Sequence, residues 1–431
     1  MDRQTFNEGL LTFIQQSPTP FHATETMAGL LLAAGFQRLE ESESWELRRG
    51  GSYLVCRDGA IIAFRLGQQP LLESGAHLTG AHTDSPCLKV KPVAERTANG
   101  YLQLGVEVYG GALLNPWFDR DLSLAGKVSF LDDDNEINSC LIDLHRPVAI
   151  IPSLAIHLDR EANSNKRVDA QKHLPPILAC MHQEESYSFE EFLLTTLRAQ
   201  NSHSGVQKIL SHELLFYDTQ PPAIIGLRDQ FIAGARLDNL LSCYLITRGL
   251  LDASADSTSI MVCNDHEEVG SASASGAQGP FLKSVLQRLV SQENTAIDAF
   301  ERVVRKSLLL SIDNAHGVHP NYADFHDPAH GPRLNGGPVI KINANQRYAS
   351  NTESVARFRH YCNRVGVNCQ SFVMRSDLAC GSTIGPLTAT ETGITTVDVG
   401  VPTFAMHSIR ELAGTEDAEQ LYRVVRAFFD R

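Results

Sequence analysis

The chain has 431 residues, is 43% hydrophobic and 20% charged, and has a formal net charge of −13. This length exceeds the usual size of a single domain, so we expect two domains. We expect no nucleic-acid partner, because phosphate binding needs a basic patch and no Lys- or Arg-rich run occurs. The start of the chain lacks the pattern of a signal peptide, and the apolar stretch at residues 27–36 is too short to span a bilayer. We therefore expect a cytosolic protein without a membrane partner.

The cysteines agree with a cytosolic location. There are 9 of them, scattered along the chain without a CxxC pair. An odd number, with several in predicted strands or helices, indicates free thiols in a reducing compartment. None is predicted to be catalytic.

The first part of the chain is predicted to open with two helices followed by strands, one of which leads to His82. From about residue 92 to residue 228 the pattern becomes mainly β. Residues 101–108 alternate apolar and polar side chains with a period of two, and a turn-like run at 132–135 connects two further strands. We expect residues 92–228 to form an inserted β-rich domain.

Two further segments of this insert have a distinct pattern. Residues 159–172 are polar and are predicted to form a long mobile or interface loop. Ser188 precedes two glutamates and an apolar run, which is the pattern of a capping box at the start of a helix.

After about residue 229, predicted strands and helices alternate to the end of the chain. Residues 1–91 and 229–431 are therefore predicted to form one discontinuous α/β domain, with a mixed central sheet flanked by helices.

Adjacent carboxylates at Glu267 and Glu268 follow a predicted buried strand at residues 259–263. Burying charge at a strand end is costly unless the charge meets a metal or a reacting proton. Adjacent residues that leave a strand point in different directions, so one glutamate could bind a cation while the other transfers protons. The alternative is a solvated surface pair.

Other possible metal ligands also follow predicted strands. His82 and Asp84 follow one strand, Asp313 follows residues 308–312, and His407 follows residues 397–401 through a short loop. In an open α/β sheet, functional side chains gather beyond the carboxyl ends of the strands. Asp238 begins a predicted buried helix, where it could be an ordinary N-cap or could bridge two metals.

These residues stand in motifs that resemble one family. In chain order the motifs are AHTDSP (81–86), RLDN (236–239), DHEEVGS (265–271), SIDNAH (311–316), NQRYASN (345–351) and AMHSIRE (405–411). Together they resemble the M18 metalloaminopeptidases, the aspartyl aminopeptidase family, from the first helix to the last. The resemblance implies a fold of the zinc exopeptidase type.

The resemblance also implies a dinuclear site. Asp238 would bridge both metals, His82 and Asp313 would complete one site, and Glu268 and His407 would complete the other. Nitrogen and oxygen ligands without thiolate suit zinc, with manganese or cobalt as other occupants. Two such cations can activate a water and polarise a carbonyl.

Within that implied site, Glu267 would be the catalytic base, and Asp84 would orient the His82 imidazole.

Three residues are implied to recognise the substrate. Lys341, between apolar neighbours in a predicted strand, would pair with an acidic N-terminal side chain; the alternative is a solvated lysine. His157 would reach the active site of a neighbouring subunit, and His319 would assist the substrate carbonyl. For both histidines the alternative is a structural role.

The sequence therefore predicts a cytosolic, dinuclear metalloaminopeptidase that removes N-terminal residues, preferably Asp or Glu, from peptides with a free N-terminus. The resemblance suggests a homo-oligomer, a dodecamer built from dimers through the inserted domain. Two alternatives stay open: the same enzyme with a neutral, Leu-like preference, and a catalytically minor, metal-stabilised assembly protein. A free base at Glu267 argues against the second, because structural metal sites close their coordination.

Overall fold

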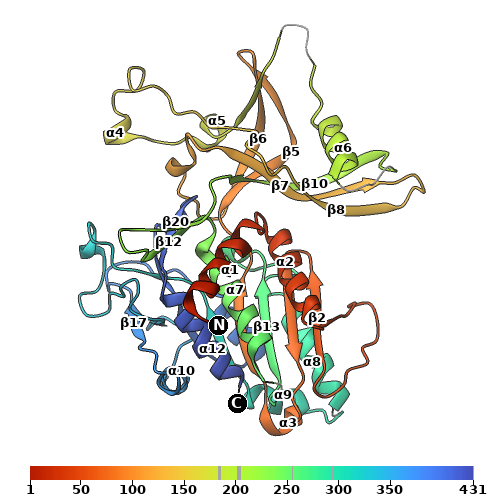
Figure 1. Cartoon of the computed structure of the whole chain (residues 1–431), viewed down its shortest axis with the longest axis vertical. Helices are drawn as coiled ribbons and strands as arrows, with labels where there is room; N and C mark the ends of the chain where they lie inside the picture. Colours follow the sequence, from red (N-terminus) through yellow and green to blue (C-terminus); the bar gives the residue numbers. More distant parts are fainter. Residues whose placement is uncertain (183–185, 201–204, 255, 294, 431) are drawn as a thin grey trace. The chain divides into compact units, whose positions relative to one another are not determined.

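A computed structural model describes residues 1–182, 186–200, 205–254, 256–293 and 295–430. The chain folds as two compact units (Figure 1). One unit contains residues 1–84, 222–406 and 411–431, and the other contains residues 85–221 and 407–410. The insert thus begins before the predicted residue 92, because the strand β5 (Cys87–Ala98) pairs within the insert's own sheet.

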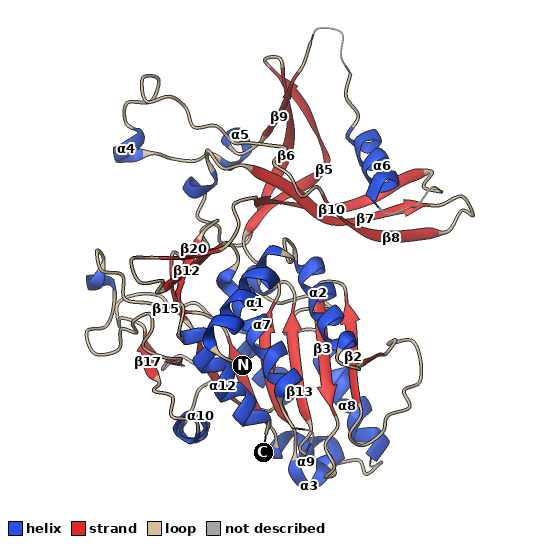
Figure 2. Ribbon diagram, in the orientation of Figure 1, coloured by secondary structure: helices blue, strands red, loops and turns tan. Residues whose placement is uncertain are grey.

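The larger unit is built on a nine-stranded mixed sheet (Figure 2). In order across the sheet, its strands are β1 (Gln37–Arg38), β2 (Ser52–Arg57), β3 (Ala60–Arg65), β13 (Ser259–Asn264), β4 (His77–His82), β14 (Leu308–Ile312), β18 (Thr395–Gly400), β16 (Val339–Ile342) and β17 (Gln370–Val373). The four central neighbours β13, β4, β14 and β18 run parallel. Their carboxyl ends therefore meet at one edge of the sheet.

The sheet is buried on both faces by helices. Along β13, Met261 and Cys263 belong to one apolar core, whereas Ile260 and Val262 belong to another. This alternation follows from the two-residue period of a strand, and each fully buried aliphatic side chain stabilises the fold by about 1.5–3 kcal/mol. Because both faces of the sheet are covered, the sequences of its central strands are continuous runs of hydrophobic residues.

Two sets of helices supply the covering layers. The first core includes side chains from α1 (Arg3–Gln15), α2 (Pro20–Ala33), α7 (Leu237–Asp252), α10 (Thr352–Arg364) and α12 (Asp417–Phe429). The second core includes side chains from α3 (Leu71–Ser74), α8 (Phe281–Glu293) and α9 (Ala299–Lys306). A further helix, α11 (Ile384–Thr392), buries Ile384 close to Gly80 of β4.

The larger unit also contains a small five-stranded sheet. Its order is β11 (Ala223–Ile225), β12 (Phe231–Gly234), β20 (Glu411–Gly414), β19 (Pro402–Phe404) and β15 (Ala315–His316). The short strand β15 follows β14 after two residues, so this sheet continues the chain beyond the carboxyl edge of the main sheet. Within the described ranges, every helix is too short or too polar to cross a membrane.

The insert is a six-stranded antiparallel sheet with its own apolar core. Its order is β8 (Ile137–Asp143), β7 (Leu122–Leu131), β10 (Lys208–Asp218), β5, β6 (Tyr101–Tyr109) and β9 (Ile177–Cys180). The helix predicted after Ser188 is α6 (Phe189–Gln200), and the Ser188 hydroxyl accepts the Glu191 N–H at 3.2 Å. The polar segment predicted as a loop contains two short helices, α4 (Ala162–Asn165) and α5 (Ala170–His173).

Candidate metal centre

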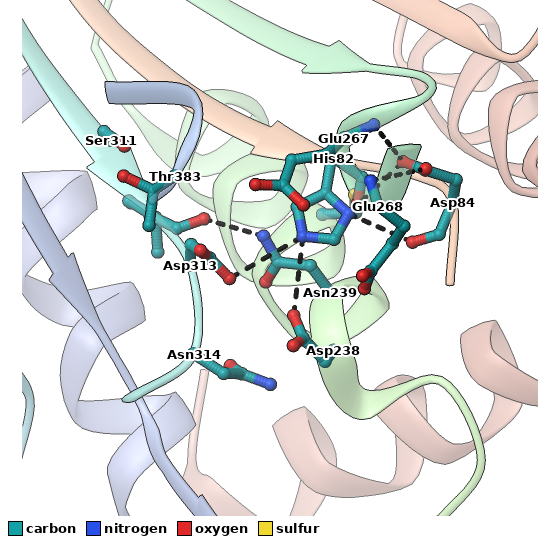
Figure 3. Close-up of polar contacts among 12 residues, drawn as sticks. His82, Asp84, Asp238, Asn239, Glu267, Glu268, Ser311, Asp313, Asn314 and Thr383 are labelled. Carbon is teal, nitrogen blue, oxygen red and sulfur yellow. Dashed lines mark hydrogen bonds and ion pairs between the residues drawn. The ribbon is translucent and has the colours of Figure 1, made fainter. Parts of the chain in front are cut away.

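Three neighbouring strands present polar side chains at the carboxyl edge of the main sheet (Figure 3). His82 is the last residue of β4, and Asp313 directly follows β14. The 3-10 helix η2 (Glu267–Val269) follows β13 and presents both glutamates. The parallel register of these strands brings segments far apart in the sequence to one place.

His82 lies at the centre of this group and is 1% exposed. Its Nε2 atom is 3.4 Å from Asp238 Oδ1 and 3.6 Å from Asp313 Oδ1. On its other side, Nδ1 is 3.0 Å from the Asp84 carbonyl oxygen and 3.4 Å from Asp84 Oδ1. The ring thus directs one nitrogen to Asp84 and the other to two carboxylates, as Figure 3 shows.

Asp238 lies at a kink near the start of α7, where its backbone angles and those of Asn239 are non-helical. The Asp238 N–H donates to Glu411 Oε2 at 2.9 Å. Its carboxylate faces the His82 ring, with Oδ1 3.4 Å from Nε2.

Asp84 connects β4 to η2. The Glu267 N–H donates to Asp84 Oδ1 at 3.1 Å, and the Glu268 N–H donates to Asp84 Oδ2 at 3.0 Å. Asp84 is 0% exposed, so these two charge-assisted bonds and its contact with His82 are shielded from water. One carboxylate therefore positions the backbone of both glutamates.

The electrostatics of the cluster follow from burial and like charge. Burial raises the pKa of Glu267 to about 8, with nearby carboxylates adding to the shift. Burial also raises the pKa of Glu268 well above its usual range. Burial alone would lower the pKa of His82, but its carboxylate neighbours raise it well above the ordinary value. The side chains thus concentrate negative charge that a cation would compensate.

Three of these side chains can reach a common ion. The ligand atoms of His82, Asp238 and Glu268 all lie within 4.8 Å of one another. They form the only such group of three His, Cys, Asp or Glu residues among those the structure describes. One imidazole and two carboxylates, with a further carboxylate at Asp313, match the nitrogen and oxygen donors of zinc sites.

Lys341 lies beside this group and is buried, 2% exposed, which excludes the alternative of a solvated lysine. Its Nζ atom is 3.3 Å from Asp313 Oδ2 and 3.1 Å from the Asn314 carbonyl oxygen. Burial opposes ionisation of Asp313, but the Lys341 ammonium and then His82 hold the pKa of that carboxyl below its usual range. Lys341 thus supplies the positive charge nearest to Asp313 Oδ2.

The other predicted site residues lie elsewhere in the chain. His407 does not follow β18 directly, because β19 intervenes, and it belongs to the short 407–410 segment grouped with the insert. Its Nδ1 atom is 3.1 Å from the Gly111 carbonyl oxygen. His157 lies in an exposed turn of the insert rather than in a strand. His319 lies in the larger unit, where its ring contacts the rings of Tyr322 and Phe404 at tilted angles.

One supporting residue escaped the sequence interpretation. Asp398 of β18 is fully buried and accepts hydrogen bonds from the hydroxyls of Ser311 at 2.6 Å and Thr383 at 2.7 Å. Burial raises its pKa. An acidic residue inside the apolar run of β18 was the available signal, because such a residue needs partners. Asp398 ties β18 to β14, the strand that ends at Asp313.

A second supporting position is Gly400. A Cβ atom at this residue would lie 1.8 Å from the Asp313 carbonyl oxygen. The Asp313 N–H also donates to the Val399 carbonyl at 3.0 Å. Only glycine allows the two chain segments to approach this closely, so Gly400 helps to set the backbone position of Asp313.

A mixed α/β sheet whose carboxyl edge carries a buried histidine–carboxylate set, with another glutamate held beside it, is the arrangement of a metal-dependent hydrolase. The model of a protein family described as "Aminopeptidase I zinc metalloprotease (M18)" matches residues 13–429. The chain belongs to this M18 family of zinc aminopeptidases. The resemblance in the motifs and the predicted α/β fold are confirmed.

Individual relatives agree with this assignment. A protein of Stutzerimonas stutzeri (strain A1501) named "Probable M18 family aminopeptidase 2" is 57% identical over 428 residues, covering 99% of this chain and 98% of the relative. A structure described as the Ape4 and Nbr1 complex has a TM-score of 0.95 at 36% identity, covering 99% of this chain and 86% of that chain. A structure described as the S. cerevisiae mApe1 dodecamer has a TM-score of 0.85 at 28% identity, covering 99% of this chain and 96% of that chain.

Proposed function

We propose that this metalloaminopeptidase uses two divalent cations and removes N-terminal Asp or Glu from peptides. The observation that carries the proposal is the convergence of His82, Asp238 and Glu268 within 4.8 Å, with Asp313 3.6 Å from the same imidazole nitrogen. Glu267 shares its backbone anchor, Asp84, with Glu268. A metal-binding carboxylate and an adjacent proton-transfer carboxylate are thus held by one side chain.

The ligand sets follow the family pattern. Asp238 would bridge both cations, His82 and Asp313 would complete the first site, and Glu268 and His407 would complete the second. The donor atoms suit zinc, the metal of the family, and manganese or cobalt would also be accepted. His407 is the ligand with least support, because it lies in the 407–410 segment and bonds to Gly111 of the insert.

Each catalytic residue has a defined task in this proposal. Bound cations would supply the charge that activates a water and polarises the scissile carbonyl. Glu267 accepts a proton from the attacking water and delivers it to the leaving amine. Asp84 keeps the His82 ring in place through Nδ1, which leaves Nε2 as the coordinating nitrogen. Burial of Glu267 supports this task, because a raised pKa makes its carboxylate a stronger base.

Lys341 is proposed to select the acidic N-terminal side chain. It is a buried cation beside the Asp313 ligand, where a substrate carboxylate could share its ammonium. A neutral, Leu-like preference is the second candidate, because the Lys341 charge is already paired with Asp313 at 3.3 Å. The two candidates differ in whether the ammonium can bind a second carboxylate.

The assembly is proposed to be a homo-oligomer, a dodecamer built from dimers through the insert. A related structure is described as the mApe1 dodecamer. Exposed Ile156 and Leu158 flank His157 in its turn, which supports contact of this turn with another subunit. His157 would then act in the neighbouring active site. The cytosolic location stays a prediction from the sequence.

The test is release of free amino acids from Asp-, Glu- and Leu-initiated peptides by the purified protein. The assay is run before chelation, after chelation, and with zinc, manganese or cobalt returned. Chelator-sensitive release that favours Asp or Glu supports the proposal, and metal analysis should find two ions per chain. Release that favours Leu would leave the metal centre and remove the role of Lys341.

A matched pair of variants isolates that role. Lys341→Met should lower release of Asp and Glu by at least about tenfold relative to release of Leu, because a buried partner charge is lost. Lys208→Met, at an exposed lysine of β10, is the control and should leave the ratio unchanged. Equal ratios in both variants would remove Lys341 from substrate selection.

A further inference from the structure

A cavity of about 240 Å³ lies in the larger unit, outside the group of proposed metal ligands. It is bordered by His316, His319, Phe372, Met374, Phe404 and Met406, among others. This volume is below the ~300–1,000 Å³ of sites that hold a whole drug-sized ligand. A cavity of this size fits one side chain rather than a complete small molecule.

Ring contacts connect this cavity to Lys341. The Lys341 Nζ atom lies 5.2 Å from the centre of the Tyr348 ring, and that ring lies 6.5 Å from the ring of Phe372. Phe372 pairs directly with Lys341 in the parallel register of β17 and β16. Phe372 in turn contacts His316 at 5.7 Å, so the two sites share an aromatic wall.

The chain connects the cavity to the metal centre as well. His316 stands in β15, three residues after Asp313. It pairs with Thr403 of β19, and the following Gly317 N–H donates to the Thr403 carbonyl at 3.0 Å. Residues on both strands border the cavity. The cavity therefore lies beside β15, the short strand that begins two residues after Asp313.

The character of the cavity is apolar. Aromatic and thioether side chains form most of the wall described above, and His319 adds a ring whose centre lies 5.4 Å from that of Phe404. Arg375 also borders the cavity, but its Nε atom is paired with Asp377 Oδ1 at 2.7 Å. A charged substrate side chain would lose water here, and the Arg375 guanidinium already has a carboxylate partner. His326 also borders the cavity with an unpaired Nδ1, but burial lowers its pKa, which favours the neutral ring.

The established reaction limits what this side chain can be. An aminopeptidase releases one residue from the amino end, so only one substrate side chain precedes the scissile bond. If Lys341 holds that side chain, a neighbouring pocket can only receive a residue after the bond. Consecutive Cα atoms are about 3.8 Å apart, so pockets for consecutive side chains must be close neighbours.

We propose that this cavity binds the side chain of the second residue of the peptide and selects an apolar side chain there. The inference rests on the proposed function, because it assigns the first side chain to Lys341. His319 is then a positioning residue in the wall of the second pocket. Within the described residues, the cavity histidines form no metal-binding group of three, which supports a binding role for the pocket rather than a further metal site.

Two peptide series on the metal-loaded enzyme test the inference. One varies the first residue with Ala fixed in second place, and the other varies the second residue with the best first residue fixed. We expect kcat/KM to be about tenfold higher for Leu or Phe than for Ala in second place, and lower for Lys or Glu than for Ala. A flat second series would overturn the inference, whereas a first series without Asp or Glu preference would overturn the role of Lys341.

A charge introduced in the wall identifies which residue occupies the cavity. Met374→Lys should raise kcat/KM for Glu over Leu in second place by about tenfold relative to the unchanged enzyme. Leu227→Lys, at a fully exposed leucine of the same unit, is the control and should leave both series unchanged. If Met374→Lys instead changes the ranking of first residues, the cavity holds the N-terminal side chain and the inference is wrong.

Discussion

The Asp84 carboxylate accepts the backbone N–H of Glu267 at 3.1 Å, although the two residues are 183 positions apart in the chain. The contact joins the end of β4 to the turn after β13. Through it, the carboxylate that contacts the His82 ring also determines where the proposed catalytic base stands. The same carboxylate accepts the next N–H along the chain. The placement of metal ligand and base therefore depends on one buried side chain.

Replacement of Asp84 by Asn should separate positioning from metal binding. An Asn side chain offers one accepting oxygen, so only one of the two N–H groups can keep its partner. We expect kcat/KM to fall about 10–100-fold with the metal content largely kept. Steady-state kinetics together with metal analysis provide the check. Unaltered kinetics in a folded variant would show that the anchor is not needed.

Glu267 and Glu268 should respond differently to the same substitution. Glu267→Gln should keep the metals and lower kcat by about 10²–10⁴-fold, because it removes proton transfer only. Glu268→Gln should lower metal affinity, because a neutral amide is a weaker ligand than a carboxylate. Metal content and turnover measured on both variants distinguish the roles. Full turnover in Glu267→Gln would remove it as the base.

Gly400→Ala should weaken the candidate metal centre, although Gly400 is not one of its proposed ligands. Its new Cβ would lie 1.8 Å from the Asp313 carbonyl oxygen, so the backbone at Asp313 must shift. We expect a loss of about 1–3 kcal/mol in the free energy of unfolding and weaker metal binding. Gly381→Ala is the control, because nothing lies within 4 Å of a Cβ there. Denaturant unfolding with metal titration compares the two, and equal effects would contradict the explanation.

Asp417, at the start of α12, should give stability a pH dependence. Burial raises its pKa to about 7 from an ordinary value of 3.8, although the N–H groups of Asn335 and Gly337 lower it. Because the folded pKa exceeds the unfolded one, the folded state binds the extra proton between these values. The free energy of unfolding therefore falls as pH rises through this window, by up to about 1.4 kcal/mol per pH unit.

The variant Asp417→Asn removes this titration. Denaturant unfolding of both proteins at several pH values between about 5 and 8 should show a flatter dependence in the variant. The Asn side chain can accept only one of the two N–H groups, so the variant also loses a hydrogen bond at every pH. The test therefore compares how steeply the free energy of unfolding changes with pH in each protein, and not its absolute value. Parallel slopes would mean that Asp417 keeps an ordinary pKa in the folded protein.

Much of the architecture could be predicted because local pattern and burial agree. The strand ends at or shortly before His82, Glu267 and Asp313 followed from apolar runs that stop at polar residues. Parallel strands bring such ends to one edge, so their meeting was predictable as well. The helix after Ser188 followed from its capping pattern. The insert boundary was missed at residue 92, because the pairing of β5 with β6 and β10 is not local.

Other features depended on contacts that no local pattern encodes. Asp238 resembled a helix cap, and only its backbone path, with its N–H bound to Glu411, turns its carboxylate toward His82. Lys341 was predicted as a substrate partner, but its contact with Asp313 across 28 positions decides how much of its charge is available. Asp398 was overlooked because its partners Ser311 and Thr383 come from separate elements.

The sequence by itself determined the family, the alternating α/β order and the chemical types of the site residues, because motifs and hydrophobic period are written locally along the chain. The tertiary structure alone decided which nitrogen of His82 faces the carboxylates, how Asp84 anchors both glutamates, and that Phe372, the register partner of Lys341, borders a separate apolar cavity. Those features depend on strand register and on contacts between side chains that are far apart in the sequence. Such contacts stabilise the protein only after the chain has folded, so no local pattern encodes them.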